Sequence, residues 1–207
     1  MIKLKKLTSA FYARKATIVA KELIGKYLVH EQNGEKFIGM ITETEAYMGP
    51  DDKAAHSYNN HRSKRNEAMY GPAGHAYIYI IYGIHICFNI VTATINIPQG
   101  VLIRGVEPIE GIRKMALNRY KTNLEDLTQA KIHNLTNGSG KLTQAMGITM
   151  NDYGINLQGN KIYLLDSKKK HNIKTSPRIN INYAGEAIHY PWRFYIKDNP
   201  YVSKPNR

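Results

Sequence analysis

The residues best suited to chemistry are concentrated between Glu43 and Asn89. This stretch begins with ETEAYMGPDDKAAH (Glu43–His56) and ends with YIYIIYGIHICFN (Tyr77–Asn89). A basic segment, HRSKRN (His61–Asn66), lies between them. Carboxylates, a histidine, tyrosine rings and positive charge therefore occur together. We interpret the rest of the chain as the scaffold that positions them.

The carboxylates of this stretch are the first candidates for catalysis. Glu43 and Glu45 fall on one face of the expected strand, because side chains in a strand alternate with period two, and Asp51 and Asp52 follow closely. A pair of carboxylates is what a glycosidase that hydrolyses sugars requires. The residue types alone leave that chemistry open.

A metal site built from the same acids is a second alternative and would indicate a metal-dependent nuclease. The histidines of the stretch are His56, His61 and His85. Their spacings match no metal-ligand signature such as HExxH or CxxC. We therefore expect no metal ion and no other cofactor.

Tyrosine rings and positive charge point towards nucleic acid. The chain carries 29 Lys and Arg against 16 Asp and Glu, a net charge of +13, which favours polyanionic partners. Arg62, Lys64 and Arg65 form a track that neutralises phosphates. The ring of Tyr82, which precedes Gly83 at an expected hairpin tip, is placed to wedge between base steps. With a carboxylate nearby, this pattern indicates base extrusion from a duplex.

Cysteine content and hydrophobic patterning indicate the cellular compartment of the protein and whether it spans a membrane. One cysteine, Cys87, excludes an internal disulfide and favours a reducing compartment, so we expect a cytoplasmic protein associated with the nucleoid through DNA. Ala76–Ile97 has no charged residue and is long enough to span a bilayer. Its content of Tyr, Ile, Val and Thr favours two strands and a turn, so we expect no membrane partner.

These side chains need a scaffold, and the sequence predicts a single α+β domain over residues 1–207 with a mostly antiparallel sheet. The expected helices are Ser9–Ile24, closed by Gly25, then Glu110–Lys121 and Leu142–Met146. The expected strands are Tyr27–Gln32 and Lys36–Tyr47, joined at Asn33-Gly34, a pair within Ala76–Thr92, then Val101–Val106 and Trp192–Ile196. Pro98-Gln99-Gly100 and Asp166–Lys174 are interpreted as turns.

A glycine-rich loop, Thr136–Lys141, precedes the last expected helix. It is not a P-loop, because Leu135 replaces the first glycine and Leu142 replaces the Ser or Thr that would hold magnesium. Such a loop can still hold one phosphate with backbone amides, and a helix start without a ligand is the equal alternative.

The order of these strings resembles the alkyladenine (3-methyladenine) DNA glycosylase family. After ETEAYMGPDDKAAH come RN, MYG, YIYIIYG, CFN, VLIRGVEP, GKLTQAMGI, PRI, AGE and PWRFYI, so that the resemblance covers nearly the whole chain. It implies flanking helices around a curved, mostly antiparallel sheet with a protruding β-hairpin, and a monomer that binds double-stranded DNA.

The resemblance also implies roles for single residues. Glu45 would be the general base that activates water for attack on the sugar C1′ carbon, and Arg104 would bind the backbone and support that water. Only the resemblance selects Glu45 over Glu43. Lys141 is counted with the DNA-binding residues, and Ser139 departs from the proline that many relatives have in this loop.

Five further residues would handle the damaged base. Tyr47 and Tyr79 would stack on the flipped base, and His56 would hydrogen-bond to it. Asn89 would disfavour normal guanine by crowding its 2-amino group, and Tyr82 would fill the gap left in the duplex.

The function thus implied is that of a monofunctional DNA glycosylase of base excision repair. Methylation at N3 or N7 makes a purine cationic, so 3-methyladenine and 7-methylguanine leave as neutral bases and one carboxylate suffices. Neutral hypoxanthine would need help at the leaving group, and the sequence leaves it open. The alternative is a non-catalytic nucleic-acid-binding protein, with steep salt dependence and no base release.

Overall fold

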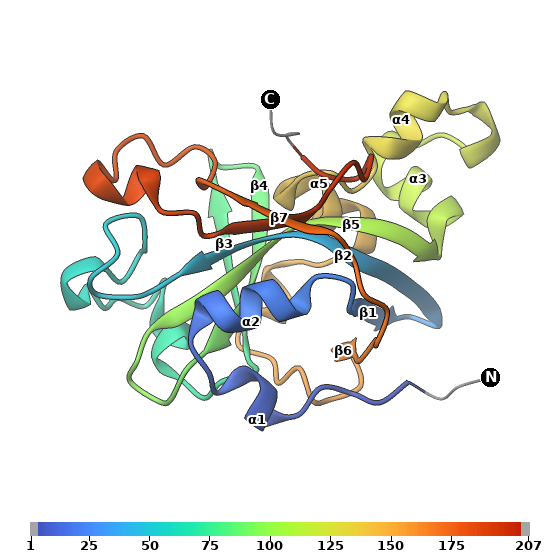
Figure 1. Cartoon of the computed structure of the whole chain (residues 1–207). Coiled ribbons are helices and arrows are strands. Elements are labelled where there is room, and N and C mark those ends of the chain that lie inside the picture. The colour runs from blue at the N-terminus through green and yellow to red at the C-terminus, as the bar shows by residue number, and fades with distance from the viewer. Residues whose placement is uncertain (1–3, 204–207) are drawn as a thin grey trace.

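A single sheet of eight antiparallel strands forms the centre of the computed structural model, which describes residues 4–203 (Figure 1). The main path runs β3-β4-β5-β2-β1-β6, while β8 pairs with β2 and with β7. The strands are β1 (Tyr27–Gln32), β2 (Glu35–Tyr47), β3 (Ala76–Ile81), β4 (His85–Thr92), β5 (Gln99–Glu110), β6 (Ile162–Leu165), β7 (Ile173–Ser176) and β8 (Arg193–Ile196). The long strands β2 and β5 curve across the molecule, as the α+β prediction with a curved sheet requires.

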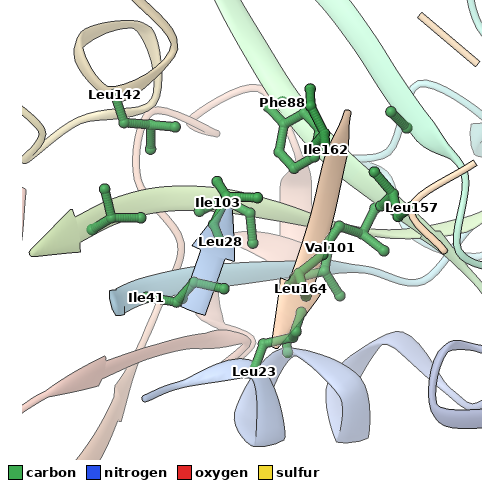
Figure 2. Close-up of a cluster of buried hydrophobic side chains, with 14 of the residues drawn as sticks. Leu23, Leu28, Ile41, Phe88, Val101, Ile103, Leu142, Leu157, Ile162 and Leu164 are labelled. Atoms are coloured by element: carbon green, nitrogen blue, oxygen red, sulfur yellow. The ribbon is translucent and has the colours of Figure 1, made fainter. Parts of the chain in front are cut away.

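Short helices flank this sheet. They are α1 (Ser9–Tyr12), α2 (Ala16–Leu23), α3 (Ile112–Tyr120), α4 (Gln129–His133) and α5 (Ser139–Met146). Helix α2 packs on β2 and β5, α5 packs on β4 and β5, and α3 packs on α5. Apolar side chains from these elements meet in one core, shown in Figure 2.

Strand β2 changes neighbours along its length, and this places its last third in the middle of the sheet. Residues 35–40 pair with β1, whereas Glu43, Thr44 and Glu45 pair with β8 on that side and with β5 on the other. Register shifts around Glu43 mark a bulge, which bends the strand and re-aims side chains. Both glutamates are consequently buried.

Two predicted hairpins are confirmed. Asn33 and Gly34 join β1 to β2 with φ of 54° and 76°, the left-handed values that a two-residue turn needs. Tyr82 and Gly83 lie between β3 and β4 with φ of 51° and 71°. The uncharged stretch Ala76–Ile97 thus forms two strands and a turn.

The single helix predicted over Ser9–Ile24 is wrong, because the chain forms α1 and α2 with a break between them. The carbonyls of Tyr12 and Arg14 accept hydrogen bonds from the Ala93 amide, at 3.2 and 3.0 Å, so neither continues a helical ladder. A distant loop overrides the local preference. Gly25 follows α2 with a φ of 83°, as expected of a closing glycine.

Other boundaries also differ from prediction. Strand β5 begins at Gln99, inside the expected turn, because Gln99 pairs with Thr92 of β4. It reaches Glu110 because β2 pairs with β5 from Gly100 to Glu110. Helix α5 begins at Ser139, since the Leu142 amide already donates to the Gly138 carbonyl at 2.9 Å. The four-residue strands β6 and β7 were not predicted, and β7 overlaps the supposed turn at Asp166–Lys174.

Two isoleucines on β5 test the contribution of the core to stability. Ile103 is fully buried and Ile109 is half exposed. We expect Ile103→Ala to lower the free energy of unfolding by about 2–5 kcal/mol, because it leaves a cavity. The matched change Ile109→Ala should cost less than about 1 kcal/mol. Urea unfolding measures both, and equal losses would contradict the assigned core.

Candidate active site

Glu45 is a fully buried carboxylate whose two oxygens are both engaged. Its Oε1 accepts a hydrogen bond from the Ile179 amide at 2.7 Å, and its Oε2 accepts one from the Tyr47 hydroxyl at 2.9 Å. Nη1 of Arg104 lies 3.6 Å from Oε2. Donors from three segments of the chain therefore fix the orientation of this carboxylate.

Glu43 has a different environment, although it lies on the same strand. It accepts hydrogen bonds from Nε of Arg193 at 2.7 Å and Nε of Arg104 at 3.1 Å. The amide and hydroxyl of Ser203 donate to it at 2.6 and 2.9 Å. With four donors, Glu43 has the surroundings of a structural ion, which distinguishes it from Glu45.

Arg104 joins the two carboxylates. Its side chain is largely buried and also donates to the Ser203 hydroxyl at 3.2 Å. Burial alone would lower the pKa of Arg104, but the charges of Glu45 and Glu43 raise it above its ordinary value. The guanidinium is therefore a permanent positive charge beside Glu45.

An aromatic cavity lies next to Tyr47. Four residues predicted to hold a base line it together, namely Tyr47, His56, Tyr79 and Asn89. The other lining residues are Ala54, Met69, Tyr77, Gly100 and Tyr183. Glu45 does not line the cavity, so the Tyr47 hydroxyl is its connection to it.

Contacts within the cavity fix the side chains of its walls. The His56 ring contacts the Tyr79 ring edge to face, with centroids 4.5 Å apart, and His56 Nδ1 lies 2.7 Å from the Tyr77 hydroxyl. Asn89 is buried and donates to the Tyr77 carbonyl at 3.1 Å. Tyr77 thus organises two of the predicted base-binding residues, a role that the sequence did not single out.

The cavity walls are uncharged near neutral pH. Burial, with smaller contributions from the charges of Arg65 and His61, lowers the pKa of His56 to about 4. Burial raises the pKa of Tyr47 and of Tyr79 well above the ordinary value. A neutral imidazole and neutral phenols therefore face the cavity.

A second, open hollow lies near Glu45. Arg104 and Ile179, which both contact Glu45, line it together with Lys141 and the first turn of α5. Lys141 itself donates to the side-chain carbonyls of Asn134 and Asn137 at 2.7 Å. Glu45 therefore contacts residues that line each of the two hollows.

Two of the expected DNA-contacting side chains, Tyr82 and Arg65, lie at the β3–β4 hairpin. Tyr82 is 81% exposed at its tip, which is the protruding hairpin that was expected. Lys64 is exposed, and Arg65 donates to the Ile80 carbonyl at 3.1 Å. Arg62 already pairs with Glu67 in the free protein, so part of its charge is compensated.

Asp52, left open as a catalytic or metal-binding acid, is a structural ion. It forms a bidentate pair with Arg178 at 2.6 and 2.8 Å, and both side chains are fully buried. Its oxygens also accept hydrogen bonds from the amides of Met48 and Ala54 at 3.0 Å. No local pattern in the sequence indicates this pair, because its members are more than a hundred positions apart.

Two further properties concern the described part of the chain only. Within residues 4–203, no three His, Cys, Asp or Glu side chains are grouped so that they could hold a metal ion. No helix of the same residues has the length and apolar character needed to cross a membrane.

The chain also matches a known family over nearly its whole length, including the segments that supply these site residues. The model of the methylpurine-DNA glycosylase family matches residues 10–200. The chain belongs to this family. It is therefore a DNA glycosylase, an enzyme that hydrolyses N-glycosidic bonds in DNA, and a component of base excision repair.

Relatives of this glycosylase from Bacillus species cover almost the same length. A protein of Bacillus mycoides is 52% identical over 201 residues, which are 94% of this chain and 98% of the relative. Proteins of Bacillus cytotoxicus and of Bacillus cereus strain AH820 are also 52% identical, over 94% of this chain and 97% of each relative. All three are named "Putative 3-methyladenine DNA glycosylase".

The neutral state of His56 predicts a pH dependence of stability. Its pKa is about 4 in the folded glycosylase against 6.5 in an unfolded chain, so the unfolded state binds more protons between these values. Folding stability should therefore fall as pH falls from 6.5 towards 4. We expect the melting temperature of His56→Gln to fall less over this range than that of the wild type.

An exposed histidine provides the control for this measurement. His189→Gln should show the wild-type slope of melting temperature against pH, because that side chain is exposed. Parallel slopes for wild type and His56→Gln would contradict the assigned neutral, buried imidazole.

Proposed function

We propose that this glycosylase releases alkylated purines, 3-methyladenine and 7-methylguanine, from double-stranded DNA with Glu45 as the base that activates water. The observation that carries the proposal is the position of Glu45. It is a buried carboxylate, oriented by Ile179 and Arg104, and its hydrogen bond to Tyr47 leads directly to an aromatic cavity. A general base next to a base-binding pocket is what cleavage of an N-glycosidic bond requires.

The exposed hairpin supports extrusion of the damaged nucleotide. Tyr82 is exposed at the tip of the β3–β4 hairpin. From there it enters the base stack of the duplex and occupies the space of the displaced base. Arg62, Lys64 and Lys141 bind phosphates without reading sequence, and Arg65 adds positive charge to the same surface where it lies over the Tyr79 ring. Extrusion costs a few kcal/mol, and least for a weakened pair, which favours damaged bases.

Within the cavity, Tyr47 and Tyr79 stack on the flipped purine and His56 hydrogen-bonds to it. The low pKa of His56 keeps the imidazole neutral at pH 7, so it neither repels a cationic purine nor serves as an acid. Asn89, fixed by its bond to the Tyr77 carbonyl, crowds the 2-amino group of guanine.

The chemical step then needs only one carboxylate. Glu45 accepts a proton from water as the water oxygen bonds to C1′. The C1′–N bond breaks, and its electron pair neutralises the positive charge of the methylated purine, which leaves without protonation. The products are an abasic site and a free base, and the proton remains on Glu45 until it returns to solvent. Arg104 supports the attacking water and the backbone beside it.

We propose that the glycosylase acts on the nucleoid as a monomer, as the family resemblance implies. A methylated purine carries a positive charge that is neutralised when the base leaves. Hypoxanthine is neutral and lacks this assistance to its departure. Because no acid is poised in the neutral cavity, its release should be slower than that of methylated purines.

The change Glu45→Gln tests the general base. Glutamine keeps the shape of the side chain but cannot take the proton, so we expect single-turnover excision of 7-methylguanine to fall by about 10²–10⁴-fold. Affinity for lesion DNA should stay within a few-fold of the wild type. The surface change Glu22→Gln is the control, and excision by Glu45→Gln at the wild-type rate would refute the assignment.

The change Tyr82→Ala tests the wedge. We expect weaker binding to a lesion duplex and slower excision, because nothing fills the space of the extruded base. Tyr82→Phe keeps the ring and should behave like the wild type. A fluorescent base opposite or beside the lesion reports flipping, and unchanged flipping by Tyr82→Ala would exclude this role.

A further inference from the structure

An arginine lies over the ring of each of the two tyrosines that are proposed to stack on the base. Cζ of Arg178 lies 4.7 Å from the ring centroid of Tyr47, and Cζ of Arg65 lies 5.6 Å from that of Tyr79. Neither arginine lines the cavity, whereas both rings do. The guanidinium groups therefore act on the rings from outside the base-binding space.

Both arginines are held in place by other contacts. Arg178 lies between the rings of Tyr47 and Trp192, 5.0 Å from the second, and is fixed by its bidentate pair with Asp52. Arg65 donates to the Ile80 carbonyl from an exposed position. These are built arrangements of charge around the cavity walls.

A cation held over an aromatic ring changes what else that ring binds. The face of a ring attracts a cation through its quadrupole. A guanidinium already over the ring draws the π electrons towards itself, and its charge repels a second cation at the same ring. A neutral base stacks on the same ring without that repulsion.

We infer that Arg65 and Arg178 are specificity-determining residues that set the preference of the cavity between cationic and neutral damaged bases. This inference rests on the proposed function, because it takes Tyr47 and Tyr79 as the walls that stack on the base. The arginines weaken the attraction for a cationic purine and leave that for a neutral purine nearly unchanged. The arginines thereby reduce the preference for cationic purines that the tyrosine rings alone would give the cavity.

The two arginines contribute unequally. The carboxylate of Asp52 compensates Arg178 at 2.6 Å. The guanidinium of Arg65 donates to a backbone carbonyl, that of Ile80, and not to a carboxylate, and its charge is one of the causes that lower the pKa of His56. Arg65 therefore has the larger effect.

Binding measured in the Glu45→Gln background tests this inference without turnover. Dissociation constants are determined for two duplexes, one with 7-methylguanine and one with hypoxanthine, and their ratio is compared between variants. We expect Arg65→Gln to raise the preference for 7-methylguanine by about three- to tenfold, the size of one cation–π interaction. Arg65→Lys keeps the charge and should leave the ratio unchanged.

Arg62 provides a matched control on the same loop. Its guanidinium lies 4.6 Å from the ring centroid of Tyr70, which does not line the cavity. Arg62→Gln removes the same charge from the DNA-binding surface and should lower both affinities without changing their ratio. The double change Arg178→Met with Asp52→Asn should shift the ratio in the direction of Arg65→Gln, but less.

Three outcomes would overturn the inference. They are an unchanged ratio in Arg65→Gln, an equal shift in Arg62→Gln, and a shift in Arg65→Lys as large as that in Arg65→Gln. Arg65 is exposed, so its variants give a result even if the buried double variant does not fold. If the wild type released no base from the 7-methylguanine duplex or from the hypoxanthine duplex, this result would instead refute the proposed function.

Discussion

Two carboxylates buried next to each other on one strand are the constraint on which this structure depends. A buried charge costs several kcal/mol unless it is paired and hydrogen-bonded. Glu43 and Glu45 meet this requirement through Arg104 on β5 and Arg193 on β8, the two strands that flank β2 at this point. Ser203, near the C-terminus, completes the set. The sheet order can thus be understood as the arrangement that brings cations to both sides of one acidic strand.

The compensation is divided so that the two glutamates differ. Glu43 takes four donors and anchors Arg104, while Glu45 keeps its contact with the cavity through the Tyr47 hydroxyl. The same segment that supplies the Ile179 amide to Glu45 supplies Arg178 to Asp52 and to the Tyr47 ring. One short stretch therefore orients the catalytic candidate and one wall of the cavity, which couples chemistry to base recognition through rigid contacts.

Local signals in the sequence were sufficient for the two hairpins and the long strands, but not for the short strands β6 and β7 or for interactions between distant segments. Asn33-Gly34 predicted the first hairpin, because left-handed turns select such residues, and Gly83 predicted the second, although Tyr82 beside it has a positive φ that bulky residues rarely adopt. The break between α1 and α2 depends on the Ala93 amide, which periodicity does not detect. The cavity residues were recognised as a group through resemblance, whereas Arg178 and Ser203 act on partners over a hundred positions away and carry no local signature.

The central claim is geometric: we propose that Glu45 and the aromatic cavity form a single site for a flipped purine. A crystal structure of the Glu45→Gln variant bound to a duplex containing 7-methylguanine tests it most directly. We expect the methylated base between the rings of Tyr47 and Tyr79, Tyr82 within the duplex, and a water within hydrogen-bond reach of residue 45 and C1′. A base bound outside this cavity, or C1′ too far from residue 45 for one water to bridge, would contradict it.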